Sequence, residues 1–184
     1  MAIDSGQLGY VKLNKSMIIA KLSKELKPVL MRGAKPEIKN PYYLIEENDQ
    51  LIFVVSSGKN GSEFNKTLGY FSTYPGMQIY QCLYGQGIMV MQRNDFAGEA
   101  KEFKITTLNP GKQISVPAGW GMCIVNTGSN LLAVLRNSFL DERNIDPKPI
   151  IEKRGFAYYV VEKKGEIGFE LNPNYSLHPQ ITTE

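Results

Sequence analysis

Residues 111–126 read Gly-Lys-Gln-Ile-Ser-Val-Pro-Ala-Gly-Trp-Gly-Met-Cys-Ile-Val-Asn, and this stretch is the most informative one for the fold. A turn signal, Asn109-Pro110-Gly111, opens it, and a second, Asn126-Thr127-Gly128, closes it. Glycine and asparagine accept the positive φ angles of tight turns, and proline presets its own φ. The segment between, 121–126, is short, apolar and rich in Ile and Val. It is therefore predicted to be a β-strand that leads into a tight turn.

The same alternation of turns and short apolar segments runs from residue 58 to residue 165. Further turn signals are Gly58-Lys59-Asn60-Gly61, Gly85-Gln86-Gly87 and Lys164-Gly165. Short strands separated by about 8–12 residues are typical of an all-β sandwich or barrel. The predicted strands are 51–56, 78–84, 88–92, 102–107, 121–126, 131–136, 158–161 and 167–171.

The N-terminal region has a different pattern. Ser16 is a suitable helix N-cap, Pro28 is a suitable stop, and the apolar residues between them follow helical spacing: Ile18, Ile19, Leu22 and Leu26. This pattern predicts a short helix that packs on the barrel, with a membrane-surface helix as the alternative. Residues 32–41 contain two prolines and several charges, and they predict an extended arm.

Length and composition indicate one globular domain. The chain has 184 residues, of which 42% are hydrophobic and 21% charged. A chain of this size buries about 70% of its unfolded surface, which is enough for a single core. The formal net charge is only +3 and is not concentrated in a basic arm, so nucleic acid is not expected as a partner.

Several residue counts narrow the function further. Two cysteines, Cys82 and Cys123, are too few for a disulfide framework, and no secretion signal is visible, so we predict a cytoplasmic protein. The longest apolar runs fall far short of the roughly twenty residues that cross a bilayer, so no membrane association is predicted. The one histidine, His178, is expected in a solvated C-terminal tail. A mechanism that needs two imidazoles is therefore excluded.

The stretch 111–126 also resembles the second conserved motif of the cupin superfamily. That motif runs glycine, five residues, proline, one residue, glycine, two residues, histidine, three residues, asparagine, and only the histidine is replaced here, by Met122. Further segments resemble the cupin-type phosphoglucose isomerases; these are 61–64, 66–72, Tyr80 with 85–87, and 152–156 with 172–175. The resemblance implies a jelly-roll cupin barrel over 51–175. We assign 1–50 to the N-terminal helix and arm, which pack on the barrel, and 176–184 to a C-terminal tail.

In that family, a His-x-His pair, a glutamate and a later histidine hold a divalent metal inside the barrel. The resemblance places Tyr70, Ser72, Gln78 and Met122 at these ligand positions. Hydroxyl and amide oxygens are weak neutral donors, and thioether sulfur prefers Cu(I). A soft ion held by Cys82 and Met122 is a poor alternative, because two sulfur donors without an imidazole make a weak ligand set. We therefore expect no metal and no other cofactor.

The candidate site lies in the barrel lumen. Residues two apart on a strand share a face, so Tyr70 with Ser72, and Gln78 with Tyr80 and Cys82, are predicted to point inward. Tyr70, Tyr80 and Gln78 are the candidate catalytic residues. Substrate-binding candidates are Ser72, Cys82, Met122 and Trp120, together with residues on the side where the family binds phosphate: Lys66, Thr67 and Gly69.

Two classes of function remain open. The first is a metal-independent, small-molecule isomerase-like enzyme with its substrate in the lumen, or a metal-free cupin that catalyses another rearrangement or a cyclisation. The second is a non-catalytic module that binds a carbohydrate or related metabolite. As a family-level expectation, the protein forms a homodimer through sheet edges, with residues 1–50 contributing.

Overall fold

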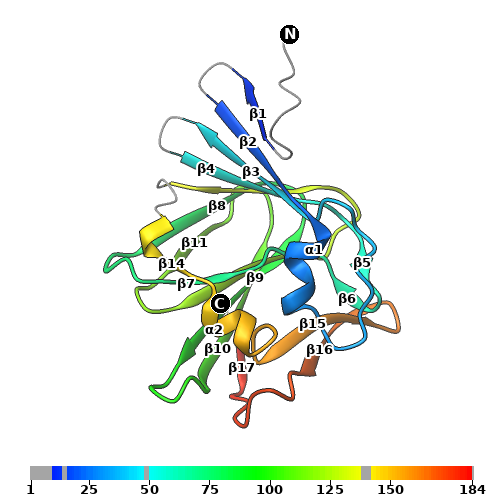
Figure 1. Ribbon diagram of the computed structural model, residues 1–184, viewed down its shortest axis with the longest axis vertical. Coiled ribbons are helices and arrows are strands. Elements are labelled where there is room, and N and C mark those ends of the chain that lie inside the picture. Colours follow the sequence, from blue (N-terminus) through cyan, green and yellow to red (C-terminus); the bar gives the residue numbers. More distant parts are fainter. Residues whose placement is uncertain (1–9, 14–15, 48–49, 138–141, 184) are drawn as a thin grey trace.

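Two large β-sheets dominate the computed structural model, which describes all residues except 1–9, 14–15, 48–49, 138–141 and 184 (Figure 1). The first sheet has seven strands in the order β1 (Tyr10–Leu13), β2 (Ser16–Lys21), β3 (Tyr42–Glu47), β4 (Gln50–Val55), β13 (Leu132–Arg136), β8 (Gln78–Tyr84) and β11 (Gln113–Val116). The second has six, in the order β14 (Ile145–Asp146), β7 (Tyr70–Ser72), β12 (Gly121–Asn126), β9 (Gly87–Asn94), β10 (Ala100–Leu108) and β17 (Ile181–Thr183).

The main hydrophobic core lies between these two sheets. Phe53 and Val134 enter it from the seven-stranded sheet, and Met89, Met122 and Ile124 enter it from the six-stranded sheet. All five side chains are almost fully buried. The sheets face each other as in a jelly roll, without one continuous hydrogen-bonded ladder around the core. The predicted all-β cupin architecture is confirmed.

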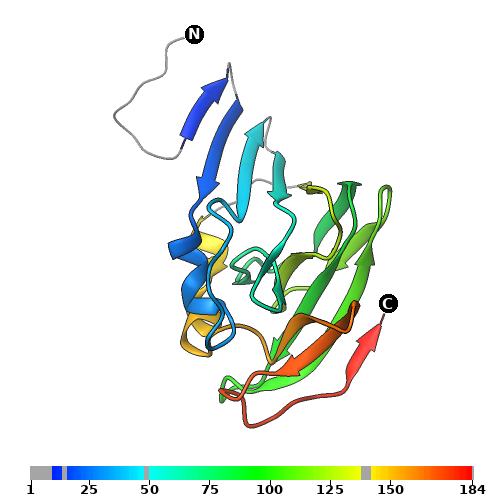
Figure 2. The ribbon, with the colours of Figure 1, turned by 90° about the vertical axis from the view of Figure 1, so that its right-hand side faces the viewer.

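A second hydrophobic core lies on the outer face of the six-stranded sheet, between that sheet and the elements that cover it (Figure 2). Phe103 and Val125 belong to that sheet, and they pack with Leu26, Ile150 and Phe156. The covering elements are α1 (Ser23–Leu26), the 3-10 turn η1 (Lys27–Val29), α2 (Lys148–Glu152) and a sheet of β16 (Glu166–Leu171), β15 (Tyr158–Lys163), β6 (Glu63–Phe64) and β5 (Lys59–Asn60). A further 3-10 turn, η2 (Glu142–Asn144), precedes β14.

The helix predicted from Ser16 is wrong over most of its length. Residues 16–21 form β2, which pairs with β3, and only Ser23–Leu26 are α-helical. Pairing with β3 overrides the helical spacing, because it turns alternate residues of β2 toward the main core, where Ile19 packs. The expected boundary at residue 50 also fails, since β3 and β4 are adjacent strands of one sheet.

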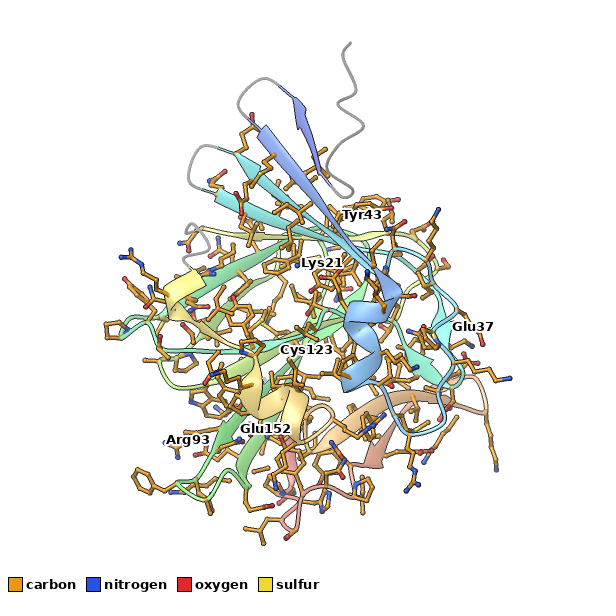
Figure 3. The ribbon with its side chains drawn as sticks, viewed as in Figure 1. Lys21, Glu37, Tyr43, Arg93, Cys123 and Glu152 are labelled. Carbon is orange, nitrogen blue, oxygen red and sulfur yellow. The ribbon has the colours of Figure 1, made fainter. Side chains whose placement is uncertain are left out.

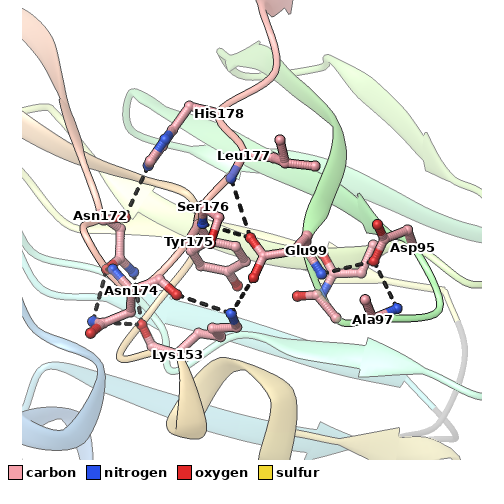
Figure 4. A network of polar contacts seen from close by, with 12 residues as sticks. Asp95, Ala97, Glu99, Lys153, Asn172, Asn174, Tyr175, Ser176, Leu177 and His178 are labelled. Carbon is pink, nitrogen blue, oxygen red and sulfur yellow. Dashed lines mark hydrogen bonds and ion pairs between the residues drawn. The ribbon is translucent and has the colours of Figure 1, made fainter.

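The C-terminal segment is not the solvated tail that was expected. Ile181–Thr183 form β17, which pairs in parallel with β10. Before it, Glu99 accepts hydrogen bonds from the backbone N–H groups of Ser176 and Leu177 at 2.7 and 3.3 Å (Figure 4). Lys153 Nζ lies 2.6 Å from the same carboxylate, and His178 Nε2 lies 2.9 Å from the carbonyl oxygen of Asn172. The pairing of β17 with β10 and the hydrogen bonds to Glu99, the residue before β10, hold the segment against the six-stranded sheet.

The other predicted strands agree with β4, β8, β9, β10, β12, β13, β15 and β16 to within a few residues. The arm over 32–41 contains no helix or strand, as predicted. No strand was predicted at β1, β3, β5, β6, β11, β14 or β17. Within the part of the chain that the structure describes, no helix is long and apolar enough to span a membrane.

Candidate functional site

A cavity of about 310 Å³ opens between the two large sheets. Strands β3 and β4 line one side of it, and β14, β7 and the residues before β7 line the other. The lining is mainly apolar, with a few hydroxyl groups and one amino group, and consists of Lys21, Tyr42, Leu44, Phe53, Thr67, Leu68, Gly69, Tyr70, Ile145 and Pro147. A space of this size and lining suits a small metabolite.

Tyr70 links this cavity to a buried polar network. The hydroxyls of Tyr70 and Tyr80 lie 2.6 Å apart, and the Tyr80 hydroxyl donates to Gln78 Oε1 at 2.9 Å. Gln78 Nε2 in turn donates to Ser72 Oγ. On the other side, Arg136 Nη1 donates to the Tyr70 hydroxyl at 3.3 Å. All five side chains are buried, so the network lies in the protein interior.

Strand alternation explains how these groups meet. Tyr70 and Ser72 are two apart on β7, and Gln78 and Tyr80 are two apart on β8, so each pair shares a face. The short connection between β7 and β8 carries the chain from one sheet to the other. Tyr80 lies opposite Arg136 in the ladder between β8 and β13, and this pairing brings the Arg136 guanidinium close to the tyrosine hydroxyls.

Both tyrosines are hydrogen-bond donors at neutral pH. Burial raises the pKa of Tyr70, although the nearby Arg136 guanidinium opposes that shift. Burial also raises the pKa of Tyr80 well above its usual range, and the neighbouring Tyr70 hydroxyl adds to the increase. Neither phenol is a base at physiological pH, because each holds its proton more strongly than a phenol in water does.

The structure brings together the four positions at which the resemblance places metal ligands. Tyr70, Ser72 and Gln78 are joined through the polar network, and Met122 lies opposite Tyr70 in the ladder between β12 and β7. The donors are a phenol, a hydroxyl, an amide and a thioether, a set that does not fit the divalent ions that prefer imidazole and carboxylate. Among the described residues, no group of three or more His, Cys, Asp or Glu side chains is arranged to hold a metal.

Lys66 is not among the residues that line the cavity, so the structure does not bring it together with Thr67 and Gly69 as predicted. Its amino group lies 2.5 Å from Glu63 Oε1 and donates to the carbonyl oxygen of Val29 at 2.8 Å. Only 8% of the Lys66 side chain and 1% of the Glu63 side chain is exposed. Glu63 also accepts a hydrogen bond from the backbone N–H of Met31 at 2.7 Å. The lysine therefore anchors the segment around Val29 to the sheets.

Thr67 and Gly69 do line the cavity, next to Tyr70. The Thr67 hydroxyl accepts a hydrogen bond from the backbone N–H of Ile124 at 3.1 Å, which fixes its position. Gly69 has a φ of +78°, and a Cβ atom there would lie 2.8 Å from the Phe156 ring and 2.9 Å from the carbonyl oxygen of Met122. Glycine is needed at this position for both its conformation and its size.

The remaining candidates fill the main core. Cys82, Met122 and Trp120 all belong to it, and Met122 is 1% exposed. Burial raises the pKa of the Cys82 thiol, so it is not a ready nucleophile. The amino group of Lys104 lies 5.2 Å from the centre of the Trp120 ring, a cation–π contact at the edge of the core.

Two polar residues of the site, Arg136 and Tyr42, were not predicted from the sequence, nor was Glu46, which lies on the same inner face. Arg136 donates to Tyr70, and Tyr42 lines the cavity with a pKa raised by burial. Glu46 lies opposite Leu51, and Leu51 lies opposite Arg136, so all three are on the inner face of the seven-stranded sheet. Arg136 was detectable, because it continues the period-two pattern of two buried residues, Leu132 and Val134.

One known protein family matches most of the chain. The sequence profile described as Glucose-6-phosphate isomerase (GPI) matches residues 42–176. The chain belongs to the GPI family. The matched region begins at β3 and ends just after Tyr175, so it contains both large sheets except for β1, β2 and β17. No curated protein sequence matches the chain.

Three solved structures show distant likenesses to this chain. Peruvianin-I, a cysteine peptidase from Thevetia peruviana latex, is 14% identical over 52% of this chain and 50% of that chain, with a TM-score of 0.38. The capsular polysaccharide assembling protein CapF from Staphylococcus aureus is 12% identical over 60% of this chain and 30% of that chain (TM-score 0.44). The Drosophila melanogaster CENP-C cupin domain is 9% identical over 69% of this chain and 71% of that chain (TM-score 0.39). These values carry no inference about function.

Proposed function

We propose that this protein binds a small sugar or sugar phosphate with a hydroxy-carbonyl group in the cavity and acts on it as a metal-independent, isomerase-like enzyme. The observation that carries the proposal is the position of Tyr70, which lines the cavity and is hydrogen-bonded to Tyr80 and Arg136. Membership of the GPI family supports the substrate class and the type of reaction.

Isomerisation of a hydroxy-carbonyl compound moves a proton between adjacent carbons. A base removes the proton next to the carbonyl, and the electron pair of the broken C–H bond shifts toward the carbonyl oxygen to give an enediolate. Return of the proton to the former carbonyl carbon, together with transfer of the hydroxyl proton to the former carbonyl oxygen, completes the isomerisation. The Tyr70 phenol and the Arg136 guanidinium supply a hydrogen-bond donor and a positive charge for the enediolate oxygen. Removal of one such donor typically costs about 10²- to 10³-fold in kcat.

Neither tyrosine is suited to be the base, because burial raises both pKa values. We assign that role to Glu46, a half-buried carboxylate on the inner face. Two strand spacings separate the backbones of Glu46 and Arg136, which is roughly 10 Å.

The experiment uses fructose 6-phosphate in D2O with a chelator present, and NMR detects both deuterium next to the carbonyl carbon and formation of glucose 6-phosphate. We expect exchange that the chelator does not reduce. Tyr70→Phe and Arg136→Gln should lower kcat by about 10²-fold, and Glu46→Gln should abolish exchange. Tyr43→Phe, on the outer face of the same sheet, is the matched control. Absence of exchange, together with no thermal stabilisation by any sugar phosphate, would contradict the proposal.

Non-catalytic binding of a metabolite is the second candidate. The raised pKa values of Tyr70 and Tyr80 favour it, because donors that do not titrate near neutral pH recognise a ligand without supplying a base. In that case, mass spectrometry of the denatured protein should identify a co-purified metabolite. The metabolite should bind to wild-type protein and bind more weakly to Tyr70→Phe, with no deuterium exchange in either.

A further inference from the structure

A second cavity, of about 540 Å³, lies outside the site described above. It opens where the residues after η1, the turn after α2 and the end of β16 meet; Figure 3 labels Glu152, the last residue of α2. Its lining consists of Met31, Arg32, Arg154, Tyr159, Glu170, Leu171, Pro173 and Asn174. The cavity between the two large sheets shares none of these lining residues. We call the second space the arginine cavity.

The arginine cavity carries an excess of positive charge. Arg32 and Arg154 are both exposed, and in the described part of the chain neither guanidinium forms a hydrogen bond or an ion pair. The lining also contains a carboxylate, Glu170, which lies 3.3 Å from the amino group of Lys163. Lys163 therefore offsets the charge of Glu170, and the charges of the two arginines remain uncompensated. Two guanidinium groups beside one cavity are suited to bind an anion.

The backbone at Arg154 has a conformation that disfavours a side chain. Its φ is +56°, in the left-handed region that residues with a Cβ atom rarely adopt. Among the described non-glycine residues, Lys164 also has a positive φ, but it lies with Gly165 in the two-residue turn between β15 and β16, where such angles are usual. Arg154 is not in a hairpin turn. Glycine would fit its backbone more easily, so the turn itself does not require an arginine.

Hydrogen bonds from neighbouring segments hold this backbone in place. The Tyr159 hydroxyl donates to the carbonyl oxygen of Arg154 at 2.8 Å. One residue earlier, the carbonyl oxygen of Lys153 accepts hydrogen bonds from the side-chain amides of Asn172 and Asn174 at 2.8 and 3.1 Å (Figure 4). Strained backbone that its surroundings hold in place clusters at ligand-binding and catalytic sites.

The other arginine follows a segment that is also anchored. The backbone N–H of Met31, the residue before Arg32, donates to Glu63 at 2.7 Å, and Glu63 is paired with Lys66 in the protein interior. The backbone beside both arginines is therefore fixed before any ligand arrives. A site that is already ordered loses little conformational entropy on binding.

We infer that the arginine cavity binds an organic phosphate, at a site separate from the proposed substrate cavity. A phosphate monoester carries a charge of about −1.5 to −2 at pH 7, which matches two guanidinium groups, whereas a carboxylate would neutralise only one. Guanidinium groups also bind phosphate oxygens through paired hydrogen bonds. Tyr159, Leu171 and Pro173 supply apolar surface for the organic part, and the volume is that of a small-molecule site.

The test titrates the protein with inorganic phosphate and with glycerol 3-phosphate at about 0.1 M ionic strength, and backbone-amide NMR reports where each binds. The signals of Arg32, Arg154 and Gly155 should shift and saturate. Glycerol 3-phosphate should bind at least as tightly as inorganic phosphate, because its carbon chain contacts the apolar wall. Acetate should bind about 10-fold more weakly or less, because it brings a single charge.

Three variants assign the binding to the two arginines. Arg32→Gln and Arg154→Gln should each weaken phosphate binding about 10-fold or more, because each loses charge-assisted hydrogen bonds. Arg93→Gln is the matched control and should not change the affinity; Arg93, labelled in Figure 3, is an exposed arginine that pairs with Glu102 and does not line the cavity. The same charge is removed in all three variants.

A fourth variant separates a binding role of Arg154 from a structural one. Arg154→Gly should melt no lower than wild type, because glycine accepts a φ of +56°, and it should lose as much phosphate affinity as Arg154→Gln. A marked loss of stability in Arg154→Gly would give the side chain a structural role and overturn the inference.

Other results would also overturn it. One is the absence of saturable shifts up to about 20 mM phosphate. Another is a pair of folded arginine variants that bind as tightly as wild type, or an equal loss of affinity in Arg93→Gln, which would reflect net charge alone. Shifts centred on Gly69 rather than on Arg154 would place the phosphate in the cavity between the large sheets instead.

Discussion

Replacement of Lys66 by methionine tests the role that the structure gives this residue, which is an anchor rather than a phosphate ligand. Lys66→Met keeps most of the aliphatic stem and removes the ammonium. Glu63 then loses its ion-pair partner while its side chain is only 1% exposed, and the carbonyl oxygen of Val29 loses a donor that lies 2.8 Å away. The variant therefore leaves a buried carboxylate without a compensating charge.

The expected loss in the free energy of unfolding follows from the burial of the Glu63 carboxylate. Breaking a buried pair by removal of one partner typically destabilises a protein by about 3–5 kcal/mol, because the remaining charge stays desolvated. For a domain of this size, 1 kcal/mol shifts Tm by about 2–4 °C, so Lys66→Met should melt about 6–20 °C below wild type. A solvated surface lysine would contribute less than about 1 kcal/mol.

Thermal melts and urea unfolding measure this difference, and the double variant Glu63→Leu/Lys66→Met is the control. Replacement of a buried pair by apolar groups is often close to neutral, so the double variant should recover at least half of the lost stability. Binding of a sugar phosphate to folded Lys66→Met should be unchanged. A single variant as stable as wild type, or one that folds normally and loses phosphate affinity, would refute the reasoning.

Three further predictions concern stability and reactivity. Gly69→Ala should destabilise the protein by about 1–3 kcal/mol more than Gly111→Ala. Both glycines have a positive φ, but of the two only Gly69 has atoms closer than 3 Å to an added Cβ. Equal urea midpoints for the two variants would contradict this prediction. The hydrogen bond from the Lys153 amino group holds the pKa of Glu99 below its usual 4.5. The ionised Glu99 carboxylate therefore stabilises the folded protein fully above about pH 4.5, and this stabilisation is lost as the pH falls through the lowered pKa of Glu99 in the folded state. Wild type should therefore exceed Glu99→Gln in Tm at pH 7 and lose that advantage in acid, and a pH-independent difference would count against the contact. Burial raises the pKa of Cys123 to about 11, so neither it nor buried Cys82 should react with a thiol reagent until the protein unfolds; rapid labelling of the native protein would disprove this.

Local patterns predicted the all-β fold and most strands of the two large sheets. Turn residues and short β-branched segments are short-range signals, and both are strong in 111–126 and around it. The N-terminal segment failed because Ile18, Ile19 and Leu22 fit helical spacing, whereas β2 is selected by pairing with β3 about 25 residues later. A sequence pattern does not include the hydrogen bonds of a distant strand, so tertiary pairing overrode the local signal.

Part of the polar network in the lumen could also be predicted, because it follows from a short-range pattern. Two-residue spacing placed Tyr70 with Ser72 and Gln78 with Tyr80, and the structure brings these pairs together. Lys66 was placed on the phosphate side because of its charge, and its buried ion pair with Glu63, three residues earlier in the chain, was not predicted. The partnership of Arg136 with Tyr70 depends on the ladder between β8 and β13, which joins segments more than 50 residues apart.

Phenol, hydroxyl, amide and thioether groups stand at the four positions that the resemblance assigns to metal ligands, and we propose that the site works without a metal. The most direct measurement is elemental analysis of the purified protein, followed by calorimetric titration with Ni²⁺, Mn²⁺, Fe²⁺ and Zn²⁺. We predict less than about 0.1 equivalent of any of these metals and no saturable binding. One equivalent of bound metal, lost in a Tyr70→Phe/Gln78→Leu variant that remains folded, would contradict the account.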